Sequence, residues 1–365
     1  MERGANGYPI AGGLYERKSP RDGEDIVISI DLEMQEYLEN RLMQCVGDIG
    51  GRGGNAVLYD GGTGEVIAMA STPYLNPADR EHIKEGATEL KSVTTAFEPG
   101  SIFKTVSAAA ILEAGVMQTT DKVFCPAALP ADEYFVTDAH ERGDETMTFR
   151  QIIQNSSNVG ISLSTEKLGF DKFYDAIMRY QLNEPTGIDY PGESSGFCAD
   201  VSDWSHIQSY NVSFGQGITV TPLQMTRFYG SLVNDGVACT PHFLLSKPQT
   251  GEIAEYSTKK LINNKDAIEP LTSMLQSVVA EGTGMDAQIE GFSPAGKTGT
   301  AEYASSDGTY VLGSYNISFV GFLPKTNSKL VCFVGVTEVP GDRITTPAFS
   351  DIMSYAIDHY RITMQ

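Results

Sequence analysis

Long hydrophobic runs are missing from this chain of 365 residues. No apolar stretch approaches the length that spans a bilayer, and the N-terminus lacks the apolar core of a signal peptide. Residues 1–7 read instead like a cut within a loop-rich region. We therefore expect the chain to be part of a longer protein whose natural N-terminal segment is absent.

Cysteine and histidine are also scarce, with five residues of each. The histidines are scattered without a pair at metal-ligand spacing, and the cysteines form no C-x-x-C pair. These patterns argue against a zinc or iron–sulfur site, and we expect no metal and no other cofactor. Cys125 and Cys198 could form a disulfide, or they could be free thiols that pack like small apolar side chains.

Basic residues are few, 26 against 47 acidic ones, and the net charge is −21. A chain of this charge repels nucleic acid, so we expect no nucleic-acid partner. The hydrophobic content of 41% and the charged content of 20% are ordinary for a globular protein and exclude wholesale disorder. A monomer is the default expectation.

The pattern of apolar residues predicts the domain organisation. Residues 1–25 are rich in glycine and charge, so we expect a linker or the stub of a preceding non-catalytic domain, with one domain over 26–365. Apolar alternation and short apolar runs predict strands at 26–30, 56–59, 66–70, 298–303, 315–323 and 330–336. Helical spacing predominates between them, apart from a stretch that follows the helix at Ser101, runs to about residue 145 and reads as loop. This order predicts one sheet with a helical insertion.

A serine and a lysine at helical spacing follow a Pro-Gly pair. Ser101 begins a pattern in which Phe103 and Val106 share a helix face, and Lys104 lies one turn further on. The Lys104 amine can therefore reach the Ser101 hydroxyl. Such a pair is a nucleophile with a built-in base. The S-x-x-K pattern is frequent by chance, and on its own it favours a capping serine followed by a solvated lysine.

Two further short motifs change that interpretation. Residues 156–158 are an S-x-N, and residues 297–299 are a K-T-G. Each alone is typical of a helix cap or a turn. In the order S-x-x-K, S-x-N, K-T-G, however, they are the signature of penicillin-binding proteins and class A β-lactamases.

A rival motif overlaps the last of these. Residues 291–298 satisfy the nucleotide-binding pattern G-x-x-x-x-G-K-[ST]. That motif needs a buried strand before it and a helix after it. Residues 284–290 are not an apolar strand, and residues 298–303 read as a strand rather than a helix. We therefore disfavour a nucleoside triphosphatase.

The chain resembles the transpeptidase domain of class B penicillin-binding proteins, the membrane-anchored serine enzymes that cross-link peptidoglycan. The resemblance runs through nearly the whole chain, over residues 63–66, 68–70, 98–104, 155–160, 186–189, 191–193, 213–217, 221–224, 296–302 and 318–322. It departs at Ile102, where a hydroxyl residue is common, and at Thr105, where proline is common. Neither position carries the chemistry.

The resemblance implies an α/β fold of the α+β type, the penicillin-binding and β-lactamase-like transpeptidase fold. An antiparallel sheet is flanked by helices, an all-helical subdomain packs beside it, and the active site lies in the cleft between them. Residues 297–300 would form the edge strand that lines this cleft.

The resemblance also implies catalytic roles. Ser101 would be the nucleophile and Lys104 its base, made neutral by burial, by the helix N-terminus and by a nearby Lys297 cation. Ser156 would relay the proton to the leaving amine, and Asn158 would hold Lys104 and the substrate amide.

The same resemblance assigns the substrate contacts. Thr298, Gly299 and Thr300 would bind the substrate, with the threonine hydroxyls on the carboxylate of a D-Ala-D-Ala stem peptide. The N–H groups of Ser101 and Thr300 would form the oxyanion hole.

Substrates, partners and location follow from the same resemblance. Peptidoglycan stem peptides would be the substrates, and β-lactams would acylate Ser101. A membrane glycosyltransferase would be a partner through segments absent from this chain. The domain would work at the outer face of the cytoplasmic membrane, anchored by an absent N-terminal segment.

Two alternatives of the same fold stay open, a β-lactamase and a β-lactam sensor. A class A β-lactamase hydrolyses its acyl-enzyme with a glutamate in an E-x-x-L-N type loop. The nearest segment here, residues 179–183, has arginine in the place of that glutamate. We therefore predict slow hydrolysis. A catalytically inactive scaffold is disfavoured by the intact Ser101, Lys104, Ser156 and Lys297.

Overall fold

The structure is a computed structural model that describes residues 4–6, 8, 10, 11, 19–304, 309–341 and 343–365. The chain divides into a small unit, Met1–Ile28 with Leu244–Ala254, and a large unit, Ser29–Phe243 with Glu255–Gln365. The small unit contains a three-stranded antiparallel sheet in the order β1, β11, β12, with bounds Val27–Ile28, Leu244–Lys247 and Glu252–Ile253.

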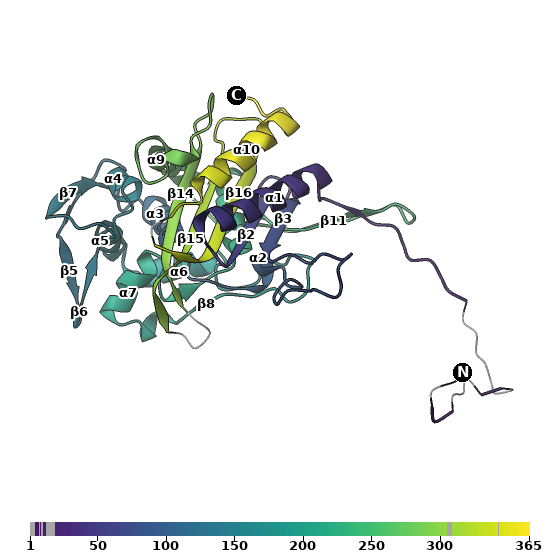
Figure 1. Ribbon diagram of the computed structural model, residues 1–365. Coiled ribbons are helices and arrows are strands. Elements are labelled where there is room, and N and C mark those ends of the chain that lie inside the picture. Colours follow the sequence, from purple (N-terminus) through teal and green to yellow (C-terminus); the bar gives the residue numbers. More distant parts are fainter. Residues whose placement is uncertain (1–3, 7, 9, 12–18, 305–308, 342) are drawn as a thin grey trace. The chain divides into compact units, whose positions relative to one another are not determined.

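The large unit is built on a five-stranded antiparallel sheet in the order β14-β15-β16-β2-β3 (Figure 1). The strands are β2 (Gly53–Asp60), β3 (Val66–Thr72), β14 (Ala295–Ala304), β15 (Tyr310–Phe322) and β16 (Leu330–Pro340). Two strands from the first part of the large unit thus share one sheet with three from its last third, through the pairing of β2 with β16, as the sequence predicted. The sequence that joins them contributes most of the helices, and β14 is an edge strand.

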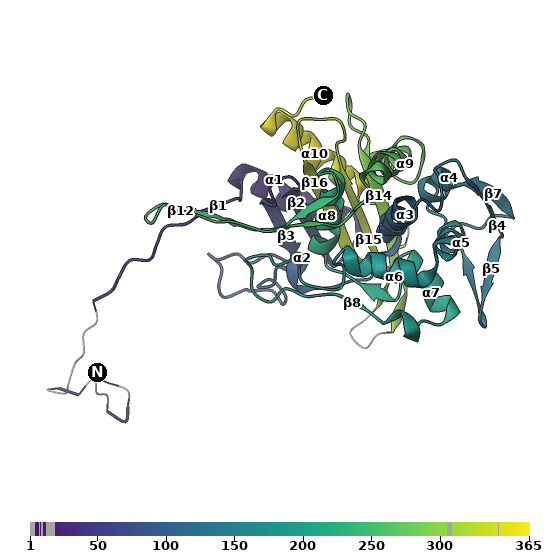
Figure 2. The same ribbon diagram turned by 180° about the vertical axis from the view of Figure 1, so that it is seen from behind.

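The sheet is buried on both faces along β2, β3 and most of β16, which explains why long parts of these strands are apolar rather than alternating with polar residues. Along β2, Val57 and Tyr59 pack into the core that contains α3, α8 and α9, whereas Ala56 and Leu58 pack against α1 and α10. Successive side chains of a strand point to opposite faces, so one strand supplies both cores. Figure 1 shows α1 and α10 across one face, and Figure 2 shows α8 on the other.

Several helices begin where the sequence supplies a capping side chain. Asp31 accepts from the N–H groups of Glu33 and Met34 at the start of α1, and Thr148 and Thr221 form capping boxes at α4 and α8. The helices are α1 (Leu32–Ile49), α2 (Lys91–Thr94), α3 (Lys104–Glu113), α4 (Phe149–Gln154), α5 (Asn158–Leu168), α6 (Phe170–Arg179), α7 (His206–Ser213), α8 (Pro222–Leu232), α9 (Ile268–Glu281) and α10 (Thr346–Tyr360).

The stretch that the sequence predicted as loop contains four short strands. The pairs are β4 (Lys122–Cys125) with β7 (Glu145–Thr148), and β5 (Ala128–Ala131) with β6 (Tyr134–Thr137). The loop prediction was wrong because each strand is only four residues long and β4 pairs with a segment distant in the sequence. The subdomain beside the sheet is therefore not purely helical.

Short strands and 3₁₀ turns complete the large unit. They are β8 (Phe197–Cys198), β9 (Ile218–Thr219), β10 (Val237–Cys239), β13 (Thr258–Lys260), η1 (Gly100–Phe103), η2 (Val201–Asp203), η3 (Lys265–Ala267) and η4 (Met285–Ala287). All five cysteines are free thiols, so the possible disulfide between Cys125 and Cys198 is not formed. Among the described residues, no helix is long and apolar enough to cross a membrane.

Candidate active site

Ser101 is held at the start of α3 by the backbone of Gly100, which precedes it. It lies in the 3₁₀ turn η1, which leads directly into α3 at Lys104. Gly100 has a φ of +54°, and a Cβ there would lie 2.6 Å from the carbonyl oxygen of Thr300. The Gly100 N–H donates to the Gly215 carbonyl at 2.9 Å. Glycine is thus required for the turn to fit against β14.

Ser156 lies in the turn between α4 and α5 and has a left-handed φ of +59°. Lys104 Nζ donates to the Ser156 carbonyl at 2.5 Å and to Ser156 Oγ at 3.1 Å. Within the described part of the chain, Lys104 has no hydrogen bond to Ser101. The predicted contact between Ser101 and Lys104 is therefore replaced by contacts of Lys104 with Ser156. Hydrogen bonds of catalytic groups are often longer without substrate.

Lys297 reaches the same hydroxyl from the edge strand. Its Nζ donates to Ser156 Oγ at 3.0 Å and to the Thr298 carbonyl at 3.1 Å. The neighbouring Gly299 has no room for a side chain, because a Cβ would lie 2.4 Å from Ser318 Oγ and 2.9 Å from Ile102 Cγ2. The K-T-G motif thus combines a buried amine with a close approach of β14 to η1.

Both lysine side chains are completely buried. Burial lowers the pKa of Lys104 to about 7, against the opposing effect of the Asp138 carboxylate. Burial and then the charge of Lys104 hold the pKa of Lys297 well below its usual range. The sequence analysis attributed the neutral form of Lys104 partly to a Lys297 cation. In the structure burial is the main cause, and the two amines compete for charge.

A cleft of about 980 Å³ opens over these residues. Its lining includes Ser101, Ser156, Asn158, Thr298, Gly299 and Thr300. The structure therefore brings six of the eight predicted site residues to one surface, with Lys104 and Lys297 buried behind it. The cleft can hold a peptide carbonyl beside the Ser101 hydroxyl. The two lysine amines can then accept the proton of that hydroxyl or return it.

Asn158 differs from its predicted contact. Its Nδ2 donates to the Thr137 carbonyl at 2.9 Å. No hydrogen bond joins it to Lys104 in the portion of the chain that the structure describes. The start of α5 turns this side chain toward β6 in the structure, so the predicted contact of Asn158 with Lys104 stays a prediction. Its place in the cleft lining still leaves it available to a substrate amide.

Sequence reasoning missed two residues that support the site. Thr283, after α9, shares a hydrogen bond of 2.7 Å with the hydroxyl of Thr298. Asp138, after β6, accepts from Ser157 Oγ at 2.8 Å and from the Val159 N–H at 3.0 Å. Neither lies in a recognisable motif, and both contacts cross between separate elements. No local signal in the sequence could have identified them.

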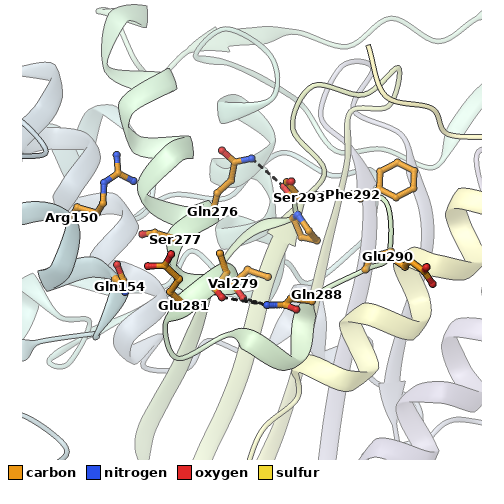
Figure 3. Close-up of a pocket in the computed structure, with 13 residues that line it drawn as sticks. Arg150, Gln154, Gln276, Ser277, Val279, Glu281, Gln288, Glu290, Phe292 and Ser293 are labelled. Carbon is orange, nitrogen blue, oxygen red and sulfur yellow. Dashed lines mark hydrogen bonds between the residues drawn. The ribbon is translucent and has the colours of Figure 1, made fainter.

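A second pocket, of about 640 Å³, lies between α9 and the segment that leads into β14 (Figure 3). Its lining includes Arg150, Gln154, Glu281, Gln288 and Phe292, and none of the eight predicted site residues. Residues 292–294, within the nucleotide-binding pattern, border this pocket. They follow the 3₁₀ turn η4 and lead into a strand. The strand and helix that a phosphate-binding loop needs are both absent here.

The segment compared with a β-lactamase loop serves the core instead. Arg179 and Tyr180 contact Glu113, with Arg179 Nη2 at 2.8 Å from one carboxylate oxygen. None of residues 179–183 lines the cleft. The described residues also contain no group of three or more His, Cys, Asp or Glu that could hold a metal ion.

Comparisons with known proteins agree with this geometry. The family model "Penicillin binding protein transpeptidase domain" matches residues 54–354. Penicillin-binding protein PbpB of Mycolicibacterium smegmatis is 29% identical over 382 residues, which cover all of this chain and 59% of that protein. Stage V sporulation protein D of Bacillus subtilis is 31% identical, over 92% of this chain and 53% of that protein. The chain thus spans little more than half the length of these relatives.

A solved structure shares the fold over almost the whole chain. Penicillin binding protein 3 of Mycobacterium tuberculosis, in complex with ampicillin, has a TM-score of 0.87 and 28% identity. The match covers 96% of this chain and 81% of that one. With the family model matched over most of the sequence, the chain belongs to the transpeptidase domain family of penicillin-binding proteins.

Proposed function

We propose that this domain is a serine D,D-transpeptidase that cross-links peptidoglycan stem peptides through an acyl-enzyme on Ser101. The observation that carries the proposal is the single Ser156 hydroxyl between two buried lysine amines, in the cleft that Ser101 lines. A general base must be neutral at working pH, and the pKa of Lys104, lowered by burial to about 7, satisfies that need.

Acylation forms an ester and releases D-alanine. Ser101 Oγ attacks the carbonyl carbon between the two D-alanines, and its proton passes to the neutral amine of Lys104. The proton then reaches the leaving nitrogen through the Ser156 hydroxyl as the C–N bond breaks. In the second half, an acceptor amine attacks the ester carbon, loses its proton to the same network, and Ser101 regains its hydrogen.

The substrate contacts follow from the position of β14. Thr298, with Thr283 and Lys297 beside its hydroxyl, suits the terminal carboxylate, and Thr300 extends that site. The N–H groups of Ser101 and Thr300 suit the developing oxyanion, since η1 packs against β14 at Thr300. Gly299 keeps the strand close to η1, and Asn158 can bind the substrate amide from the opposite wall.

Relatives support the choice of substrates and inhibitors. PbpC of Pseudomonas aeruginosa, 30% identical over 94% of this chain, is named a probable peptidoglycan D,D-transpeptidase. The Mycobacterium tuberculosis protein was solved with ampicillin and with aztreonam. For this chain we accordingly propose D-Ala-D-Ala stem peptides as substrates and β-lactams as acylating inhibitors.

The remaining expectations concern the whole protein. We propose that residues 26–365 form the transpeptidase domain and that 1–25 link it to a preceding non-catalytic domain. In this proposal an N-terminal anchor holds the protein at the outer face of the cytoplasmic membrane. A membrane glycosyltransferase would be its partner through segments outside this chain.

The test is to label the domain with a fluorescent penicillin and locate the adduct by intact mass and peptide mapping. A stable adduct on Ser101, absent from Ser101→Ala, is the expected result. Rapid multiple turnover of a chromogenic cephalosporin would identify a β-lactamase instead. A stable adduct without cross-linking of stem peptides by the full-length protein would favour a β-lactam sensor.

A further inference from the structure

Asp138 contacts the turn that carries Ser156 from a separate element. It follows β6, and its side chain is only 11% exposed although it lines the cleft. Its carboxylate accepts from Ser157 Oγ at 2.8 Å and from the Val159 N–H at 3.0 Å. Arg142 Nε donates to the same carboxylate at 2.6 Å. Ser157 and Val159 lie at the junction of α4 and α5, whereas Arg142 belongs to the segment that follows Asp138.

The turn needs such support because Ser156 is held in an unfavourable conformation. A left-handed backbone is unfavourable for a residue with a Cβ, and Ser156 has a φ of +59°. In this conformation both its carbonyl and its hydroxyl accept hydrogen bonds from Lys104. Ser157 and Val159, which follow it, are the residues that Asp138 holds.

Arg142 completes the arrangement. Its Nη1 donates to the carbonyls of Cys125 and Gly143, both at 2.9 Å, so the guanidinium joins Asp138 to the end of β4. Asn158 Nδ2, bonded to the Thr137 carbonyl, adds a parallel contact beside Asp138. Residues 137 and 138 therefore hold the turn from 156 to 159 by hydrogen bonds on one side, and Arg142 in turn holds Asp138.

The charge of Asp138 also acts on Lys104, the proposed catalytic base. The Asp138 carboxylate favours the protonated form of Lys104 and so opposes the larger effect of burial on its pKa. Arg142, paired with Asp138, moderates that field, and Lys297 is the other charged neighbour of Lys104. His140, Glu141 and Glu145 also line the cleft.

We propose that Asp138, paired with Arg142, is a positioning residue of this active site. It holds the Ser156 turn in the geometry that lets one hydroxyl bridge two lysines, and its charge acts on Lys104. This inference rests on the proposed function, because it assigns Asp138 a role in the same acylation reaction.

The test measures the acylation rate constant with a fluorescent penicillin as a function of pH. Asp138→Asn should slow acylation about tenfold or more, because Ser156 is misplaced. It should also move the acidic limb of the pH–rate profile, where the rate rises with pH, to lower pH, because a negative charge near Lys104 is lost. Arg142→Gln should move the limb in the opposite direction, since the carboxylate is then uncompensated. Asp138→Glu keeps the charge, so its limb should stay near the wild-type position while the rate falls.

Asp351→Asn is the matched control. It breaks another Asp–Arg pair, with Arg41 Nε at 2.7 Å, between α10 and α1. This control should leave both rate and limb unchanged. Equal rates in Asp138→Asn and wild type, or rate losses without movement of the limb, would overturn the proposal.

Two outcomes separate this proposal from other failures. If Asp138→Asn does not fold, the shift in Arg142→Gln alone decides: a limb at higher pH supports the role, and an unmoved limb contradicts it. If the wild-type domain forms no adduct on Ser101, the proposed function fails first. That result is distinguishable from failure of the Asp138 role, which requires an active wild-type enzyme.

Discussion

Lys104 and Lys297 donate hydrogen bonds to the same oxygen atom, Ser156 Oγ, at 3.1 and 3.0 Å. The two lysines come from different elements, the first residue of α3 and the edge strand β14. Two ammonium groups that contact the same oxygen repel each other, and burial deprives both of water. The charged form of each lysine is therefore disfavoured, and the pair tends to carry fewer than two positive charges. The arrangement keeps one amine ready to take a proton and the hydroxyl between them ready to pass it on.

The pH dependence of acylation should report the Lys104 base. Its pKa is lowered to about 7, so the neutral, active form increases as pH rises through neutrality. We expect the acylation rate constant for a penicillin to increase from about pH 6 to a plateau above about pH 8. Stopped-flow fluorescence on a penicillin stable over this range would measure it. A rate that keeps rising to the ordinary pKa of lysine would contradict a depressed base.

Ser156 allows its hydroxyl and its backbone conformation to be tested separately. Ser156→Ala and Ser156→Gly both remove the hydroxyl between the lysines, so both should reduce acylation by about 10²-fold or more. Only alanine retains the cost of the φ of +59°. The glycine variant should therefore be more stable than the alanine variant by about 1 kcal/mol in urea unfolding. Equal stability would mean that the left-handed turn stores no strain.

Gly100 should not tolerate a side chain. A Cβ would meet the Thr300 carbonyl oxygen at 2.6 Å, so Gly100→Ala must push η1 away from β14. We expect acylation to fall by about 10²-fold, because the serine moves relative to Thr300. Gly115→Ala is the control: Gly115 also has a positive φ, of +66°, but open space around it. Its acylation rate should match that of the wild type, with only a small loss of stability.

Glu113 should make the stability of the fold depend on acid. Burial alone would raise its pKa, but hydrogen bonds from Arg179, Tyr180 and the Asn263 N–H outweigh burial and lower it. A lowered pKa in the folded state means that Glu113 stabilises the fold above its unfolded pKa. This contribution is lost as pH falls through the folded pKa.

Glu113→Gln should cost about 2–3 kcal/mol at neutral pH, because Arg179 keeps a partly buried charge without its partner. It should also flatten the decline in stability below about pH 5. Urea unfolding at several pH values would measure both effects. Lys247→Gln, which breaks an exposed pair with Glu252, is the control and should change little. A variant with the same acid sensitivity as the wild type would remove Glu113 as its cause.

Local patterns in the sequence predicted the elements with strong signals. The strands of the central sheet and the helix that follows Ser101 were predicted, because apolar periodicity acts within one segment. The strands between 122 and 148 were missed, since four-residue strands leave almost no periodic signal. The strand predicted at 26–30 was not recognised as part of a separate sheet, in which β1 pairs with β11.

The three motifs in order determined the family and the identity of the chemical groups: a serine nucleophile, two lysines, a second serine and a K-T-G strand. Residue type and spacing were sufficient because this chemistry needs those side chains whatever surrounds them. Tertiary structure decided how they work. It turned Lys104 toward Ser156 rather than Ser101, buried both amines and so lowered their pKa values, and brought in Asp138 and Thr283 from unrelated segments. Burial and contacts between distant elements arise only when the chain is packed, and no local pattern encodes them.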